Sequence, residues 1–83
     1  MTLEEAVAHT KTFTTKPSNS ELLKLYALYK QATEGDNTSE RPGGFDFVAS
    51  AKYNAWEAEK GKSKEVASDE YVALVQKLSE SYK

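Results

Sequence analysis

The sequence contains no cysteine and only one histidine, His9, among its 83 residues. Without cysteine there are no disulfide bonds and no thiolate metal ligands, so packed side chains alone must hold the fold together. A single histidine also excludes the two-histidine zinc motif of a helix. A hydrolase needs a nucleophile, a base and usually an orienting carboxylate, and no such set is recognisable in the chain. We therefore expect no catalytic residue, no metal site and no cofactor.

Charge of neither sign dominates the chain, and long apolar runs are missing. Lysine and arginine total 11, aspartate and glutamate total 13, and the formal net charge is −2. Nucleic-acid-binding proteins usually carry a strong basic excess, so we expect no nucleic-acid partner. No apolar run approaches the roughly 18 residues that span a membrane, and the start of the chain does not resemble a signal peptide. These absences favour a cytoplasmic protein with no transmembrane segment and at most transient membrane or enzyme contact.

Proline and glycine are scarce, and the alternating pattern typical of strands is absent. Helix-forming residues dominate instead, which predicts an all-α fold. A chain of 83 residues, 39% of them hydrophobic and 29% charged, is typical of one small globular domain, here residues 1–83. We expect four helices, over roughly residues 2–13, 18–34, 48–60 and 63–82.

Capping residues mark the predicted helix ends. Pro17 should end the first segment, because the residue before a proline avoids helical backbone angles. Ser18 and Glu21 have the spacing of a capping box at the start of the second helix, and Gly35 suits a left-handed cap at its end. Ser63 is a candidate N-cap for the fourth helix.

Residues 35–46 have the composition of a loop throughout. This loop is longer than the few residues that usually connect helices in a bundle, so it argues against a simple up-down-up-down arrangement. Phe45 and Phe47 stand at its end, and we expect them to anchor the loop in the hydrophobic core.

The second helix carries more than one distinctive face. Tyr26, Tyr29 and Lys30 follow i, i+3, i+4 spacing and share an arc of about 100°. Leu25 and Leu28 cluster about 130° away and supply an ordinary core-facing stripe. The tyrosine and lysine face is therefore available to bind something else.

Similar features recur elsewhere in the chain. They are Leu22 and Leu23 one turn before Tyr26, Lys52 four residues before Trp56, Lys11 four residues after Val7, and Tyr71 near the start of the last apolar stripe. Taken singly, a helical tyrosine is usually a core residue with its hydroxyl at the surface, and a lysine beside a ring usually has its ammonium in water. Together these side chains suit a ligand that has phosphates, an aromatic base and an apolar tail.

Four motifs closely resemble the acyl-CoA-binding protein family, whose small members are cytosolic and have a single domain. They are Lys16-Pro17, then Tyr26-x-x-Tyr29-Lys30-Gln31-Ala32-Thr33-x-Gly35-Asp36, then Arg41-Pro42-Gly43, then Ala51-Lys52-Tyr53-x-Ala55-Trp56. The resemblance implies a four-helix up-down-down-up bundle with a long overhand loop between the second and third helices. It also implies a monomer that binds, buffers and transports medium- or long-chain acyl-CoA, one ligand per chain, without catalysis.

The resemblance implies a set of ligand contacts as well. Lys30 and Tyr26 would meet the 3′-phosphate and nucleotide, and Lys52 and Lys11 other parts of CoA. Tyr29 and Tyr71 would lie around the adenine and ribose, and Leu22 and Leu23 would line the acyl groove. The chain departs from the family pattern at Tyr53, where tryptophan is common, at Ala49-Ser50, where Gly-Lys is frequent, and at Glu34 and Gly44, where apolar residues are frequent.

Two alternatives remain open from the residues alone. A helical bundle with an apolar groove could instead accept a partner helix as a protein-interaction module. A general fatty-acid carrier would bind free fatty acids as well as their CoA esters. A protein-interaction module would not need Lys30 or Lys52 to bind its partner. A general fatty-acid carrier would not need a cation that binds phosphate.

Overall fold

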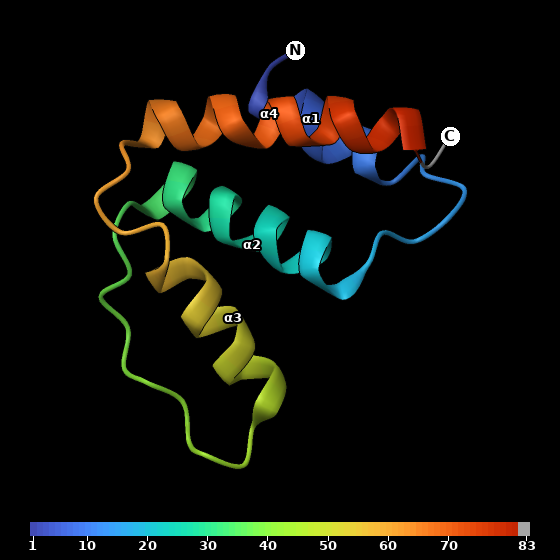
Figure 1. The fold of residues 1–83 in the computed structure, drawn as a ribbon. Helices are drawn as coiled ribbons and strands as arrows, with labels where there is room; N and C mark the ends of the chain where they lie inside the picture. Colours follow the sequence, from blue (N-terminus) through green and yellow to red (C-terminus); the bar gives the residue numbers. More distant parts are fainter. Residues whose placement is uncertain (82–83) are drawn as a thin grey trace.

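A computed structural model describes residues 1–81 and, within them, four helices and no strand. The helices are α1 (Leu3–Thr10), α2 (Asn19–Glu34), α3 (Phe47–Glu57) and α4 (Lys64–Ser81). In Figure 1, α1 and α4 run in one direction across the view and α2 and α3 run in the other. The predicted all-α, up-down-down-up fold is therefore confirmed. Tyr82, which the sequence placed at the end of the last helix, lies outside the described residues.

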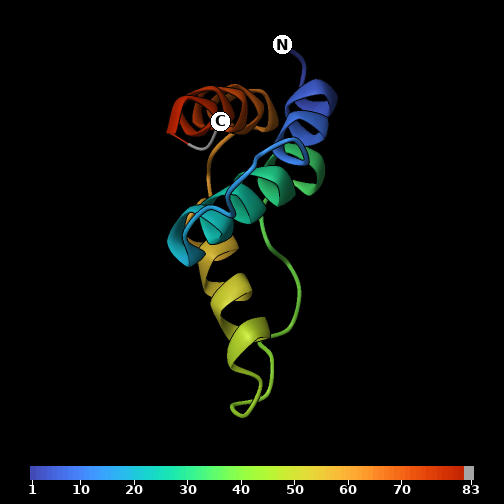
Figure 2. The same ribbon diagram turned by 90° about the vertical axis from the view of Figure 1, so that its right-hand side faces the viewer.

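The hydrophobic core lies among α1, α2 and α4. Its buried members are Ala6, Leu25, Leu28, Tyr71, Val75 and Leu78. Helix α4 packs against both α1 and α2, whereas α3 packs against α2 alone and projects away from the other helices (Figure 2). Helix α2 therefore buries Leu25 and Leu28 and leaves Tyr29, which is 40% exposed, on a different face.

The predicted N-caps of α2 and α4 form. The Ser18 backbone N–H donates to Glu21 Oε1 at 2.9 Å, and the Glu21 N–H donates to Ser18 Oγ at 3.2 Å, which completes a capping box. Ser63 Oγ accepts from the Val66 N–H at 3.1 Å at the start of α4. Gly35 ends α2 as predicted and its φ is positive, but φ +81° and ψ −150° lie outside the left-handed helical region, in a region that glycine alone adopts readily.

Two helices are shorter than the sequence predicted. Helix α1 ends at Thr10, where the backbone tightens into i→i+3 bonds and the Thr10 hydroxyl donates to the Val7 carbonyl at 2.6 Å. Helix α3 ends at Glu57, and a turn follows that carries the buried carboxylate of Glu59. Burial works to raise the pKa of Glu59, but hydrogen bonds from Lys24 and Lys62 outweigh it and lower the pKa overall.

Gln31 fastens the end of α2 to the turn before α4. Its side chain is fully buried, and its amide donates to Asp36 Oδ1 at 2.9 Å and to the Lys62 carbonyl at 2.7 Å. Asp36 Oδ1 also accepts from the Gly61 N–H at 2.9 Å. These hydrogen bonds from the Gly61 N–H and from Gln31 lower the pKa of Asp36. The Gln31 amide thus connects the end of α2 and the start of the following loop to the turn before α4, 31 residues further along the chain.

Truncation of Gln31 should destabilise the fold. We expect Gln31→Ala to lower the free energy of unfolding by about 2–4 kcal/mol, because it leaves a cavity and deprives the Lys62 carbonyl and Asp36 of a donor. Chemical denaturation at neutral pH measures this change. Gln76→Ala is the matched control, since Gln76 is exposed on α4 and its truncation should change stability by less than about 0.5 kcal/mol. Equal stabilities of the two variants would contradict the role given to Gln31.

The prediction that Phe45 and Phe47 anchor the loop in the core is wrong. Their exposed fractions are 99% and 79%. The reason is that α3 meets only α2, so the first turn of α3 lies away from the core formed with α1 and α4. Asp46 caps that turn by accepting from the Ala49 N–H at 2.9 Å, which leaves both phenylalanines outside.

Polar and aromatic contacts hold the 35–46 loop instead. The Trp56 indole N–H donates to the Gly35 carbonyl at 2.9 Å, and Arg41 lies over the Tyr53 ring at 5.1 Å. Asn37, 7% exposed, accepts from the Ser39 N–H at 2.9 Å. The long connection is thereby attached at its start and middle, while its end stays exposed.

Candidate functional site

Three open cavities adjoin Tyr26 on α2. We call the one bordered by α1 and α4 the α1 cavity, the one between the 38–42 loop and α3 the loop cavity, and the one at the first turns of α2 and α3 the tip groove. Their volumes are about 510, 440 and 510 Å³ respectively. Tyr26 lines all three, so the cavities adjoin one another at this side chain.

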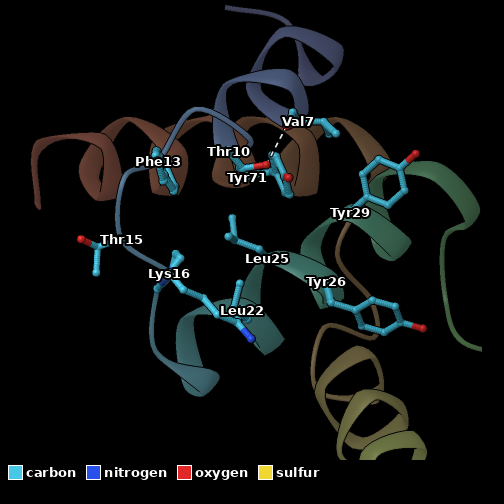
Figure 3. Close-up of a pocket in the computed structure, with 11 residues that line it drawn as sticks. Val7, Thr10, Phe13, Thr15, Lys16, Leu22, Leu25, Tyr26, Tyr29 and Tyr71 are labelled. Carbon is cyan, nitrogen blue, oxygen red and sulfur yellow. Dashed lines mark hydrogen bonds between the residues drawn. The ribbon is translucent and has the colours of Figure 1, made fainter. Parts of the chain in front are cut away.

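The α1 cavity is apolar with tyrosine hydroxyls at its edge. Figure 3 shows Tyr26 and Tyr29 reaching out from α2 while Tyr71 enters from α4 beside Thr10. The Tyr71 and Tyr29 ring centroids are 6.2 Å apart. Burial raises the pKa of Tyr71, which keeps its hydroxyl neutral well above neutral pH. The cavity therefore presents ring surfaces and neutral hydroxyl groups.

The loop cavity holds two ammonium groups over aromatic rings. Lys30 Nζ lies 4.9 Å from the centroid of the Trp56 ring, and Lys52 Nζ lies 5.4 Å from that of Tyr26. Lys30 also forms an ion pair with Glu34, and that hydrogen bond is the main reason why the pKa of Lys30 is raised. Both lysines therefore present positive charge to a ligand that enters between α2 and α3.

Sequence spacing assigned the wrong ring to Lys52. Lys52 and Trp56 are four residues apart on α3, yet Lys52 lies over Tyr26 and Trp56 lies under Lys30, so each cation meets a ring of the other helix. The reason is that Trp56 is only 7% exposed and turns toward α2, where its N–H meets the Gly35 carbonyl.

The tip groove is lined mainly by apolar side chains. Leu22 and Leu23 come from α2, and Phe47, Val48 and Ala51 from α3. Lys16 and Lys52 complete its lining, so cations adjoin an otherwise apolar trough. Such a trough suits a hydrocarbon chain attached to an anionic head.

Most of the residues singled out from the sequence meet at this surface. Seven of them line one or more of the three cavities: Leu22, Leu23, Tyr26, Tyr29, Lys30, Lys52 and Tyr71. Lys11 is exposed after the end of α1 and lines none of the three. The sequence predicted no ligand contact at Lys16 and placed Phe47 in the core. The Lys16-Pro17 motif was the available signal for Lys16.

Residues 1–81 contain neither a candidate metal site nor a helix that could span a membrane. No cluster of three or more His, Cys, Asp or Glu side chains there could hold a metal ion. None of the helices in that range is both long enough and apolar enough to cross a membrane.

Comparison with known proteins gives one consistent result. Residues 2–75 match the family model described as "Acyl CoA binding protein". The chain is 51% identical over 82 residues to Acyl-CoA-binding protein homolog 1 of Caenorhabditis elegans, which covers 99% of this chain and 95% of that protein. It is 54% identical over 81 residues to Acyl-CoA-binding protein of Dictyostelium discoideum, with 98% and 96% covered.

A solved structure agrees in fold. The crystal structure of Oryza sativa Acyl-CoA-Binding Protein 2 superimposes with a TM-score of 0.90 at 44% identity, over 95% of this chain and 88% of that one. The similarity therefore covers both the sequence and the arrangement of helices.

Proposed function

The chain belongs to the acyl-CoA-binding protein family, and we propose from this premise that it binds acyl-CoA esters and carries them unchanged. The observation that supports this most directly is the continuity of the site. Tyr26 joins a cavity with two cations over aromatic rings to a trough of leucine, valine and phenylalanine. CoA esters have the same order of groups, with phosphates at one end and a hydrocarbon tail at the other.

The phosphate end of the ligand would occupy the loop cavity. Lys30 and Lys52 would donate charge-assisted hydrogen bonds to the phosphates, including the 3′-phosphate, and Tyr26 offers a ring against which the adenine can stack. Tyr29 and Tyr71 would contribute ring and hydroxyl contacts from the α1 cavity. Lys11 is the remaining proposed CoA contact, and it would have to reach the ligand from outside these cavities.

The acyl chain would lie in the tip groove, over Leu22 and Leu23 of α2 and under Phe47 and Val48 of α3. Each methylene removed from water contributes roughly 0.8 kcal/mol. Phe47, which is exposed in the empty protein, would be partly covered by the bound acyl chain. No bond is made or broken in this scheme, so we propose a carrier and buffer rather than an enzyme, with no cofactor.

The setting of this function is also a proposal. Residues 1–83 would act as one binding domain, monomeric and cytoplasmic, with one ligand per chain. Contact with a membrane or an enzyme would be at most transient and would serve ligand delivery. Neither a nucleic acid nor a partner helix is needed in this scheme.

Calorimetric titration with palmitoyl-CoA tests the proposal. We expect one-to-one binding of the ester, with free CoA and free palmitate each at least about a hundredfold weaker, because each supplies only one end of the interaction. Equally tight binding of palmitate would instead identify a general fatty-acid carrier. Absence of binding by folded protein would overturn the proposal and favour a peptide-binding module.

A further inference from the structure

One of the two lysines of the loop cavity is already paired with a carboxylate of the protein. Glu34 lines this cavity together with Lys30 and Lys52, and it forms an ion pair with Lys30 one turn earlier on α2. The exposed fractions of the two side chains in this pair are 25% for Lys30 and 52% for Glu34. The pair is therefore partly accessible to solvent and lines a cavity that a ligand could enter.

The position of Glu34 has two consequences for an anionic ligand. Its carboxylate accepts a hydrogen bond from the same ammonium that a phosphate would need. It also places a negative charge beside the bound phosphate, and like charges at short range oppose binding. Glu40 lines the same cavity, but no ion pair joins it to either lysine among the described contacts.

An exposed ion pair between residues i and i+4 is weak, so it can exchange with a stronger ligand. A phosphate carries more charge than a carboxylate and more acceptor oxygens. Lys30 can therefore leave Glu34 for the phosphate while its stem remains against Trp56, whose ring centroid lies 4.9 Å from Nζ.

We propose that Glu34 is a specificity-determining residue that limits affinity: its carboxylate holds Lys30 in the empty protein and competes with the ligand phosphate. This inference rests on the proposed function, since it concerns the same cavity. Because the Glu34 carboxylate competes with the ligand phosphate for Lys30, the protein releases its ligand more readily. It also discriminates against weakly charged anions, which cannot displace the carboxylate.

The variant Glu34→Gln keeps the size of the side chain and removes its charge. We expect it to bind palmitoyl-CoA about threefold to tenfold more tightly than the unmodified protein at low ionic strength, with a smaller gain at high salt. Glu80→Gln is the matched control. Glu80 is exposed at the opposite end of α4 from the loop cavity, so this variant should stay within about twofold of the unmodified protein.

A double-mutant cycle shows whether the effect passes through Lys30. In a Lys30→Met background the gain from Glu34→Gln should fall by at least about half, because no ammonium remains for the carboxylate to occupy. Thermal unfolding checks that all variants are folded.

Three results would overturn the inference. They are equal affinity of Glu34→Gln and the unmodified protein, an equal gain in Glu80→Gln, and a full gain in the Lys30→Met background. Failure of the unmodified protein itself to bind palmitoyl-CoA would overturn the proposed function, and this inference with it.

Discussion

Palmitoyl-CoA should bind about a thousandfold more tightly than octanoyl-CoA, which has eight fewer methylene groups. Complete burial of these methylenes at roughly 0.8 kcal/mol each would contribute about 6 kcal/mol. The tip groove is an open trough rather than an enclosed cavity, so we expect about two-thirds of that value, near 4 kcal/mol. Calorimetry across a series of chain lengths measures the increment per methylene.

Two phenylalanines provide a matched test of where the acyl chain of the ligand lies. Phe47 lines the tip groove, whereas Phe45, two residues earlier, lines none of the three cavities. Both are exposed, so neither substitution removes a core contact. Phe47→Ser should reduce the ratio of the affinity for palmitoyl-CoA to the affinity for octanoyl-CoA. Phe45→Ser should leave this ratio unchanged. An affinity independent of chain length would rule out the tip groove as the acyl site.

The sequence predicted those parts of the fold that depend on local chemistry. Caps act over three or four residues, so Ser18, Glu21 and Ser63 could be identified from spacing alone. The separate faces of α2 also follow from the angle between successive residues, which a helix fixes. Leu25 and Leu28 are accordingly buried, and Tyr26 adjoins the cavities.

Contacts between helices could not be predicted in this way. Helical spacing places Lys52 near Trp56, but the orientation of the indole depends on the Gly35 carbonyl, which is distant in sequence. The exposure of Phe47 has a different cause. Hydrophobicity predicts burial in a core, yet a groove for an apolar ligand requires apolar side chains that stay at the surface until the ligand arrives.

The motif that revealed the family combines two physical roles. Gln31, Gly35 and Asp36 fasten the end of α2 to Trp56 and to the turn before α4 through hydrogen bonds. Tyr26 and Lys30 face the cavities from the same helix. The structural residues therefore fix the position from which the functional residues reach the ligand. A sequence motif alone does not separate these roles.

Removal of both cations from the loop cavity should weaken palmitoyl-CoA binding by about 3 kcal/mol, a factor of more than a hundred. Lys30→Met and Lys52→Met retain much of each apolar stem and delete the ammonium group. Hydrogen bonds to charged groups contribute about 1.5–3 kcal/mol each, and we take the lower value because a ligand in this cavity stays partly solvated. Binding of free palmitate should change less, since it has a single carboxylate and no phosphate.

The control must separate local contacts from net charge. Lys60→Met with Lys77→Met removes the same charge from two exposed positions that line none of the three cavities. At physiological salt, charges more than about 8 Å away are largely screened, so this control should lose less than about threefold in affinity. Equal losses in the two double variants would mean that long-range attraction alone draws CoA to the protein. A large loss confined to the Lys30 and Lys52 pair would place the phosphates between α2 and α3, where each ammonium lies over a ring of the other helix.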